Sequence, residues 1–212
     1  MKELNTSKIE HYLQKGKDHK YWYETESQKL LELLPEFKDL PILKCFAITS
    51  MTTSIEANVH LALKALMQMQ RGEIFHGFLP AQRMYLEMIY FQKDVPGRKI
   101  GNFIKALEGD KNSVVVDIWM CRAFDMLNAR KLPNGRDYFK SPSKAEYNEI
   151  ESWVKNACEI SYHIEPRQFQ SMVWAGVKRE FGMTRNVTWS DLLIKKRGMF
   201  SYETEKVQYT GM

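Results

Sequence analysis

The chain has 212 residues, of which 44% are hydrophobic, and its formal net charge is +5. This length can bury a sizeable core in one domain or in two small lobes that share a cleft, and the composition is that of an ordinary soluble globular protein. The three cysteines are scattered without a Cys-x-x-Cys pair and the histidines form no HExxH pair, so the sequence predicts no disulfide framework, no zinc site and no iron–sulfur cluster. The positive charge favours a polyanionic partner, although many basic proteins bind none.

The N-terminal stretch, residues 1–20, lacks the apolar core of a signal peptide. No run approaches the roughly 18 apolar residues that a membrane helix requires. We therefore expect a cytoplasmic protein with no membrane partner. The sequence does not predict an oligomeric state.

Hydrophobic periodicity predicts helices along nearly the whole chain and almost no strands. After an aromatic opening, a short helix is expected over residues 26–34. Apolar residues then recur every three or four positions over residues 55–70, which predicts an amphipathic helix, and the polar run at 50–54 offers its N-cap. Pro80 stands where a first-turn proline belongs and opens a predicted helix over 81–91, whose apolar character on most sides suits a central position.

In the second half, Gly97 allows a tight turn before a predicted helix, and Gly109 marks the end of that helix. Asp117 follows a run of three valines and is expected to cap the next helix. Residues 131–143 are rich in proline, glycine, asparagine and serine, which predicts a loop that is a candidate connection between lobes. The helices predicted in this half cover residues 98–107, 118–130, 147–160 and 167–181.

Lys99 and Asp117 stand at the beginnings of two successive predicted helices, 117 − 99 = 18 positions apart. An aspartate directly before an apolar helical pattern is a preferred N-cap, a purely structural role worth about 1 kcal/mol. The same position holds a carboxylate near the positive end of the helix dipole, where it stays ionised and could stabilise a cation that develops in a reaction. Lys99 is by default a solvated or phosphate-contacting lysine; alternatively, its amine could act as a nucleophile and form a Schiff base.

The segment from Val95 to Leu127, VPGRKIGNFIKALEGDKNSVVVDIWMCRAFDML, combines a Pro-Gly turn with this lysine, this aspartate and an arginine five residues later. It resembles the hairpin, lysine and aspartate of helix-hairpin-helix DNA glycosylases of the endonuclease III type. The resemblance implies an all-α fold of two helical lobes, without an iron–sulfur cluster. One lobe would be residues 45–116 with the hairpin, and the other residues 1–44 plus 117–212, with the lysine and the aspartate facing each other across the cleft.

The resemblance also implies a surface that contacts DNA. In these glycosylases the turn exposes backbone N–H groups that hold a DNA phosphate, often together with a bound monovalent cation. By position, these contacts would come from Pro96, Gly97, Arg98 and Arg122. The chain departs from the family at the hairpin, which is shortened to the Pro-Gly pair, and directly after the aspartate, where Ile-Trp replaces Thr-His.

A weaker match lies upstream, where CFAITSMTTSIEANVHLAL, residues 45–63, resembles the glycosylase segment that meets the gap left by an everted base. By position Met51, Thr52 and Thr53 would line the base pocket or probe the duplex, and Trp119 could stack on the base. Extruding a base costs a few kcal/mol, which an inserted side chain partly offsets. A capped helix start with a buried methionine explains the first three residues equally well, and a core position is the usual role of a tryptophan.

Together these matches imply a DNA N-glycosylase that binds double-stranded DNA, flips out a damaged or modified base and breaks its glycosidic bond with Asp117. Lys99 would add an abasic-site lyase activity. No cofactor is implied apart from the monovalent cation. The segment around Lys99 also resembles small phage and bacterial proteins, which implies a phage or prophage origin and a place in the host cytoplasm.

Three other functions remain open at the level of sequence. A phage transferase on a glycosylase-like fold would hypermodify bases instead of removing them. A non-catalytic DNA-binding protein would keep only the scaffold. A helical interaction protein would need neither DNA nor chemistry, and the 18-residue spacing would then be a coincidence. The target base cannot be derived from the residues.

Overall fold

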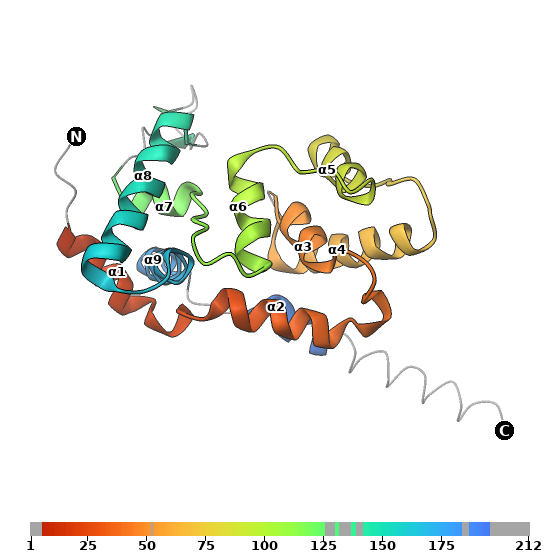
Figure 1. Cartoon of the computed structure of the whole chain (residues 1–212), viewed down its shortest axis with the longest axis horizontal. Coiled ribbons are helices and arrows are strands. Elements are labelled where there is room, and N and C mark those ends of the chain that lie inside the picture. Colours follow the sequence, from red (N-terminus) through yellow and green to blue (C-terminus); the bar gives the residue numbers. More distant parts are fainter. Residues whose placement is uncertain are drawn as a thin grey trace. The chain divides into compact units, whose positions relative to one another are not determined.

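The computed structural model describes residues 6–51, 53–125, 130–131, 137–138, 142–183 and 187–195, and this part of the chain is all-α, as the sequence predicts (Figure 1). Its helices are α1 Thr6–Lys15, α2 Trp22–Leu33, α3 Ile42–Thr49, α4 Ile55–Gln70, α5 Pro80–Tyr90, α6 Arg98–Leu107, α7 Ile118–Ala123, α8 Lys144–Ala157 and α9 Pro166–Glu180. Short turns of 3₁₀ helix lie at Lys17–His19 and Pro35–Phe37, and the π-helical turn Cys158–Tyr162 extends α8. Within the described residues, β pairing is limited to β1, Arg130–Lys131, and β2, Asp137–Tyr138, which are antiparallel. None of the described helices is long and apolar enough to cross a membrane.

Two of the predicted helices have the predicted bounds, because each begins at a strong local signal. Before α4, the Ser54 hydroxyl accepts a hydrogen bond from the amide of Ala57 at 3.2 Å, as an N-cap does. Before α6, Gly97 has a φ of +100°, a backbone conformation that favours glycine. Asp117 caps α7, as expected. Much of the loop predicted at 131–143 lies outside the described residues.

Two helix predictions are wrong in part. α7 ends at Ala123 rather than near Arg130, because Asp125 adopts a positive φ of 53° that breaks the helical backbone. α5 is not a central helix: it buries three side chains, while Met84 is 46% exposed and Tyr90 45% exposed. The apolar residues of α5 therefore include an exposed group, and the helix is not buried on most of its sides.

A further short helix at residues 189–195 lies in a tail whose polar composition gave no helical signal. Its first residue, Trp189, is buried and packs against Phe46 of α3 with ring centroids 5.3 Å apart. The amide and hydroxyl of Ser190 donate hydrogen bonds to the buried carboxylate of Glu26 at 3.2 and 2.8 Å. Contacts with residues far away in the sequence therefore hold this helix in place.

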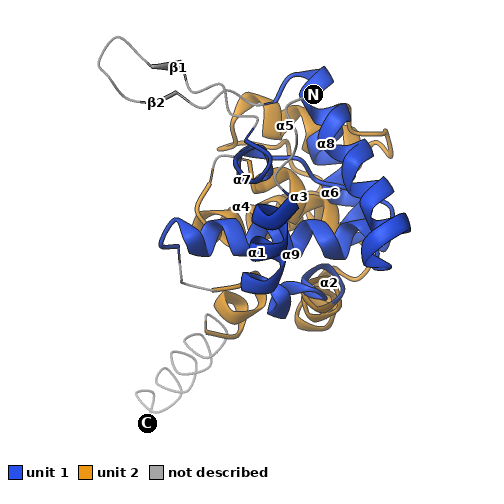
Figure 2. Cartoon of the chain, turned by 90° about the vertical axis from the view of Figure 1, so that its left-hand side faces the viewer, with its two compact units in different colours: residues 1–24, 97–185 blue, residues 25–96, 186–212 orange. Residues whose placement is uncertain are grey.

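The chain divides into two compact units, shown in different colours in Figure 2: unit 1 comprises residues 1–24 and 97–185, and unit 2 comprises residues 25–96 and 186–212. This division differs from the one expected from the sequence, which placed α6 with α3, α4 and α5. In the structure α6 belongs with α7, α8 and α9. The physical reason is a set of hydrogen bonds that joins α6 to α8, described below.

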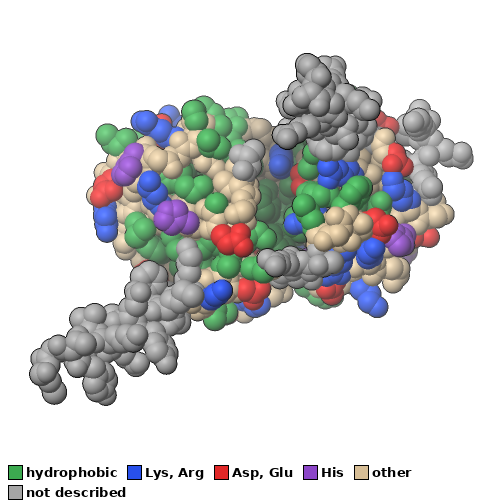
Figure 3. Space-filling model, turned by 180° about the vertical axis from the view of Figure 1, so that it is seen from behind, with side chains coloured by type: hydrophobic (Ala, Val, Ile, Leu, Met, Phe, Trp, Pro, Cys, Tyr) green, Lys and Arg blue, Asp and Glu red, His purple; other side chains and the backbone are tan. Residues whose placement is uncertain are grey.

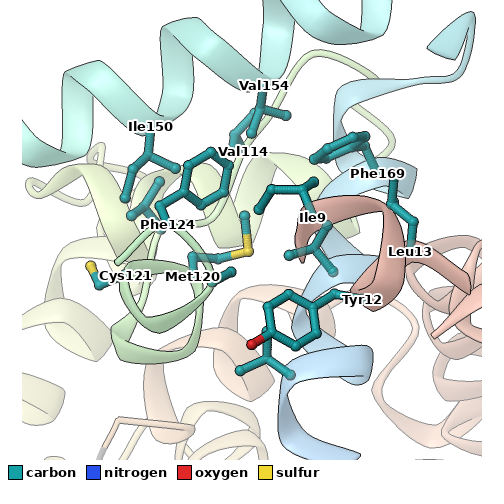
Figure 4. Packing of buried hydrophobic residues seen from close by; sticks show 14 of the residues in the cluster. Ile9, Tyr12, Leu13, Val114, Met120, Cys121, Phe124, Ile150, Val154 and Phe169 are labelled. Atoms are coloured by element: carbon teal, nitrogen blue, oxygen red, sulfur yellow. The ribbon is translucent and has the colours of Figure 1, made fainter. Parts of the chain in front are cut away.

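The core of unit 1 gathers buried side chains from four helices and from the extended segment before α7 (Figure 4). Ile9 and Leu13 come from α1, Val114 from the extended segment, Met120 and Phe124 from α7 and its end, Ile150 and Val154 from α8, and Phe169 from α9. The three valines predicted as a β-rich run are buried without strand pairing. This core fixes the helix that Asp117 begins against α9.

The first and last helices of unit 1 cross with their backbones in contact. A Cβ atom added at Gly176 of α9 would lie 2.0 Å from the carbonyl oxygen of Tyr12, and one added at Gly16 would lie 1.9 Å from the carbonyl oxygen of Met172. Real side-chain carbons never approach backbone atoms so closely, so both positions require glycine. The crossing therefore determines where α9, and the side chains it carries, lie relative to α1.

In unit 2, buried polar side chains hold the turn between α3 and α4. The amide nitrogen of Gln82 donates to the carbonyl oxygens of Thr49 and Met51 at 3.1 and 3.3 Å. The amide nitrogen of Asn58 donates to the carbonyl of Phe46 at 3.1 Å and to the Thr49 hydroxyl at 2.8 Å. The turn therefore has a defined conformation that depends on α5 as well as on its own helices.

Candidate functional site

The carboxylate of Asp117 is held by three hydrogen-bond donors from two helices. One oxygen, Oδ1, accepts the amides of Trp119 and Met120 at 2.9 and 3.1 Å, and the other, Oδ2, accepts the indole N–H of Trp174 at 3.0 Å. The first two bonds are the N-cap that the sequence predicts, while the third comes from α9, 57 residues away. These three donors fix the orientation of the carboxylate, and the residue as a whole is partly exposed.

Trp174, which donates to this carboxylate, belongs to a connected group of aromatic side chains in unit 1. Trp174 lies 6.3 Å from Trp22, centroid to centroid, and Trp22 in turn stacks on Phe103 at 6.4 Å with an interplanar angle of 16°. All three residues are partly exposed, and Trp174 also packs against the core of unit 1. Beside them Tyr23 is buried and donates a 2.6 Å hydrogen bond to Gln170; burial, and secondarily the charge of Asp117, raises its pKa well above the usual value. Exposed aromatic faces next to a fixed anion can receive a flat, apolar ring such as a nucleobase.

The cation that adjoins this group is Lys178, one helical turn after Trp174 on α9. Its Nζ lies 4.0 Å from the centroid of the Trp174 ring whose N–H is bonded to Asp117. Burial lowers the pKa of Lys178, and the negative charge of Asp117 partly opposes that effect. The sequence does not predict a role for this lysine or for Trp174, because no motif near Asp117 or within residues 166–180 indicates that the two segments are in contact.

Lys99 lies in the same unit as Asp117, at the second position of α6, where it is exposed. Both charges act on one buried thiol: burial, and secondarily the charge of Asp117, raises the pKa of Cys121 to about 12, and the charge of Lys99 opposes this rise. Among the described residues, the Lys99 amine has no hydrogen-bond or salt-bridge partner. The two predicted groups are therefore near a common point of unit 1, but the structure gives them no direct contact.

The start of α6 is positioned by the side chain of Tyr147 on α8. Its hydroxyl donates to the carbonyl oxygen of Val114 at 2.8 Å and accepts hydrogen bonds from the amide of Val116 at 3.3 Å and from the side chain of Asn102 at 3.1 Å. The hydroxyl also lies 3.4 Å from the carbonyl oxygen of Arg98. Burial raises the pKa of Tyr147 to about 12, so the hydroxyl stays protonated and able to donate. This junction fixes α6 and the segment leading to Asp117 relative to each other.

Replacing Tyr147 with phenylalanine should lower the free energy of unfolding by about 1–3 kcal/mol, because the buried amide of Val116 loses its acceptor. Chemical denaturation measures this change. Tyr162→Phe is the matched control, since the Tyr162 hydroxyl makes no hydrogen bond among the described residues, and it should cost less than about 0.5 kcal/mol. Equal costs for the two variants would contradict the structural role of the Tyr147 hydroxyl.

The predicted DNA-contacting hairpin spans the unit boundary at Pro96–Gly97. The carbonyl of Gly97 accepts the amide of Gly101 at 2.9 Å, as in the first turn of a helix, and is therefore directed along α6. A monovalent cation at this turn stays a prediction. Arg98 lies 3.6 Å from the carboxylate of Glu151 and is about half exposed, which leaves part of its guanidinium open to a phosphate.

Arg122 and Trp119 form a second cationic and aromatic group with Phe181. The Arg122 guanidinium carbon lies 4.2 Å from the Trp119 ring centroid and 5.1 Å from that of Phe181. The two rings meet edge to face at 6.0 Å. Trp119 is partly buried and packs against the core of unit 1, as the structural alternative expects, and its ring also lies against the arginine that the resemblance assigns to DNA binding.

The three residues predicted to line a base pocket or act as a wedge belong to unit 2. Met51 is partly buried, and Thr53 donates to the carbonyl of Thr49 at 2.9 Å. Thr52 lies outside the described residues. These contacts match the structural alternative of a capped helix start, and a role at the base stays a prediction.

Basic and acidic side chains are interspersed on the face of the molecule shown in Figure 3, with hydrophobic side chains among them. The net positive charge therefore does not gather into one basic surface on that face. Within the described ranges, no group of three or more histidine, cysteine, aspartate or glutamate side chains could hold a metal ion.

A comparison with known proteins places the chain in a family. No curated protein and no solved structure matches it. A family model described as "Family of unknown function (DUF7178)" matches residues 14–181. The match runs from α1 to the end of α9 and includes Lys99, Asp117 and Lys178. Since it covers more than half of the chain, the protein belongs to the DUF7178 family.

Proposed function

We propose that this protein is a DNA N-glycosylase that flips a damaged or modified base out of double-stranded DNA and breaks its glycosidic bond. The observation that carries the proposal is the Asp117 carboxylate, which three donors fix beside partly exposed aromatic rings. Such an arrangement supplies both requirements of the reaction, a surface for a flat base and a fixed anion for the sugar cation. The resemblance of the 95–127 segment to glycosylases supports the same reaction.

In the proposed reaction, the everted base stacks on the aromatic surface that Trp22 and Trp174 form. The C1′–N bond breaks with its electron pair leaving on the base, and the negative charge of Asp117 stabilises the positive charge that develops on the sugar. A water molecule then adds to C1′ and gives its proton to the carboxylate. If a lysine amine adds in place of water, the product is a Schiff base, and the enzyme is also a lyase. Lys99 is the amine that the resemblance assigns to this step.

In this proposal, DNA is bound by basic side chains of unit 1 that precede and follow Asp117 in the sequence. Arg98 at the start of α6 and Arg122 at the end of α7 are partly or largely exposed and would contact phosphates, with the backbone of Pro96–Gly97. Each phosphate contact releases counterions, so binding should weaken steeply as salt increases. The proposed reaction does not need a bound cation at the turn.

Base release is the direct test. Wild-type protein is incubated with duplexes that each carry one altered base, including uracil, 5-hydroxymethyluracil, alkylated purines and oxidised purines, and the free bases are measured by mass spectrometry. We expect release from at least one duplex, stimulated by low salt. Intact strands with heavier nucleosides would instead identify a base-modifying transferase. Salt-sensitive binding without any product would identify a DNA-binding protein, and no binding an interaction protein; each of these results would overturn the proposal.

A further inference from the structure

We propose that Lys178, rather than Lys99, is the amine that forms a Schiff base at C1′ of the target nucleotide. This inference rests on the proposed function and names a residue for its covalent step. It assigns a catalytic role to the last turn of α9, a helix outside the segment that resembles glycosylases. It also predicts that the lysine beside the Pro-Gly turn contacts the DNA backbone instead of the sugar.

The first support is the position of the amine. Nζ of Lys178 lies 4.0 Å above the indole ring of Trp174, and the N–H at the edge of that same ring is bonded to Oδ2 of Asp117 at 3.0 Å. One aromatic side chain therefore holds an amine over its face and a carboxylate at its edge. A sugar bound at the carboxylate would have its C1′ carbon within reach of a flexible lysine side chain. The contacts of Lys99 in the structure include no comparable link to Asp117.

The second support is the environment of the amine. An amine attacks carbon only in its neutral form, which burial beside an aromatic ring favours. Lys178 is partly buried and has a lowered pKa for this reason, whereas Lys99 is exposed to water. Among the described residues, no carboxylate lies within salt-bridge distance of Nζ of Lys178. No ion pair therefore stabilises the protonated form of this amine. The nearby Asp117 can accept that proton.

In the covalent step, the neutral Lys178 amine adds to C1′ as the base leaves with the electron pair of the broken glycosidic bond, and the nitrogen, positively charged after the addition, gives one proton to the departing base. The nitrogen lone pair then forms a C=N bond while the C1′–O4′ bond breaks, and O4′ takes the proton that Asp117 had accepted from Lys178. The result is an iminium ion that joins the protein to the opened sugar. At an abasic site the same iminium ion forms from the C1′ aldehyde with loss of water.

A purely structural role for Lys178 has a distinct expectation. Its methylene groups pack against Trp174, and its positive charge suits the C-terminal end of α9. Arginine keeps the packing, the charge and the contact with the indole ring, but it cannot form a Schiff base. The variant Lys178→Arg therefore separates the chemical role from the structural one, and Lys99→Arg is its matched counterpart.

The experiment uses the full chain and a labelled duplex with a single abasic site, so it does not depend on knowing the target base. Sodium borohydride reduces any Schiff base to a stable secondary amine, and the protein–DNA adduct is measured by gel and located by peptide mass spectrometry. We expect the wild-type adduct to map to Lys178, Lys178→Arg to reduce its yield at least about tenfold, and the adduct that Lys99→Arg still forms to map to Lys178. Circular dichroism confirms that both variants are folded.

Two results would overturn the inference. An adduct that maps to Lys99, or that survives Lys178→Arg, would show that another amine is the nucleophile. The absence of any adduct above that formed by a non-specific basic protein would show that no lysine acts in this way. Either result leaves the release of free base unaffected, so failure of this inference is distinguishable from failure of the proposed function. Conversely, an adduct at Lys178 without base release from any duplex would confirm Lys178 as the nucleophile and contradict the proposed glycosylase activity.

Discussion

Asp117→Asn is expected to lower the rate of base release by at least about 100-fold while the protein stays folded. Asparagine is as good an N-cap as aspartate, so its amide oxygen can keep the hydrogen bonds from Trp119 and Met120. The negative charge that would stabilise the sugar cation is lost. The NH2 group of asparagine then takes the place of Oδ2 and cannot accept the indole N–H of Trp174, so the loss of this hydrogen bond should cost about 1 kcal/mol of stability. Single-turnover kinetics on the best substrate and thermal denaturation measure the two effects.

Two control variants make this result specific. Asp125→Asn removes a carboxylate just after the same helix, where it forms a salt bridge with Lys8, and should leave base release within about threefold of wild type. Trp174→Phe keeps an aromatic ring but removes the donor to Oδ2, so a loss of about tenfold is expected if the donor positions the carboxylate. Undiminished base release by a folded Asp117→Asn variant would remove Asp117 from the mechanism.

Gly176→Ala should lower the free energy of unfolding by about 3 kcal/mol or more. The added methyl group would lie 2.0 Å from the carbonyl oxygen of Tyr12, and that oxygen belongs to the backbone of α1 and cannot rotate away. The two helices would have to separate, and the core between them would lose contacts with Ile9 and Phe169. Urea denaturation followed by fluorescence measures the change.

Gly182→Ala is the control for the general cost of replacing a glycine. Gly182 has a φ of +76° but no atom within 4 Å of an added Cβ, so its replacement should cost only the backbone strain of about 1 kcal/mol. If Gly176→Ala were no more destabilising than this control, the close crossing of α1 and α9 would be contradicted. Base release should also fall in Gly176→Ala, because the shifted helix carries Trp174 and Lys178.

Local signals were sufficient to predict most of the helices. Ser54 and Gly97 set the starts of α4 and α6, and Pro80 and Pro166 occupy first-turn positions in α5 and α9. Errors arose where a distant contact or a single backbone angle decides the structure. The positive φ of Asp125 ends α7, and the residues around Asp125 do not predict this backbone angle.

The candidate site could be predicted only in the part that one continuous segment encodes. Asp117 as a helix cap follows from the residues next to it and is confirmed, while a site that it shares with Lys99 stays a prediction. Trp174 and Lys178 were missed because the hydrogen bond to Asp117 spans 57 residues. The sequence places Tyr147 only at the start of a predicted helix and gives no sign that its hydroxyl joins α8 to α6.

The discontinuous build of unit 1 has a consequence for the order in which the protein folds as the ribosome makes it. α1 emerges first, but its glycine crossing requires α9, so this helix must wait for more than a hundred further residues before it can bury its apolar face. Contacts of such long sequence separation slow folding. Residues 25–96 form a nearly continuous unit and can begin to collapse meanwhile. Synthesis of α9 then supplies Trp174, whose indole N–H donates to the Asp117 carboxylate. A truncated chain that ends before residue 174 would have Asp117 without this donor.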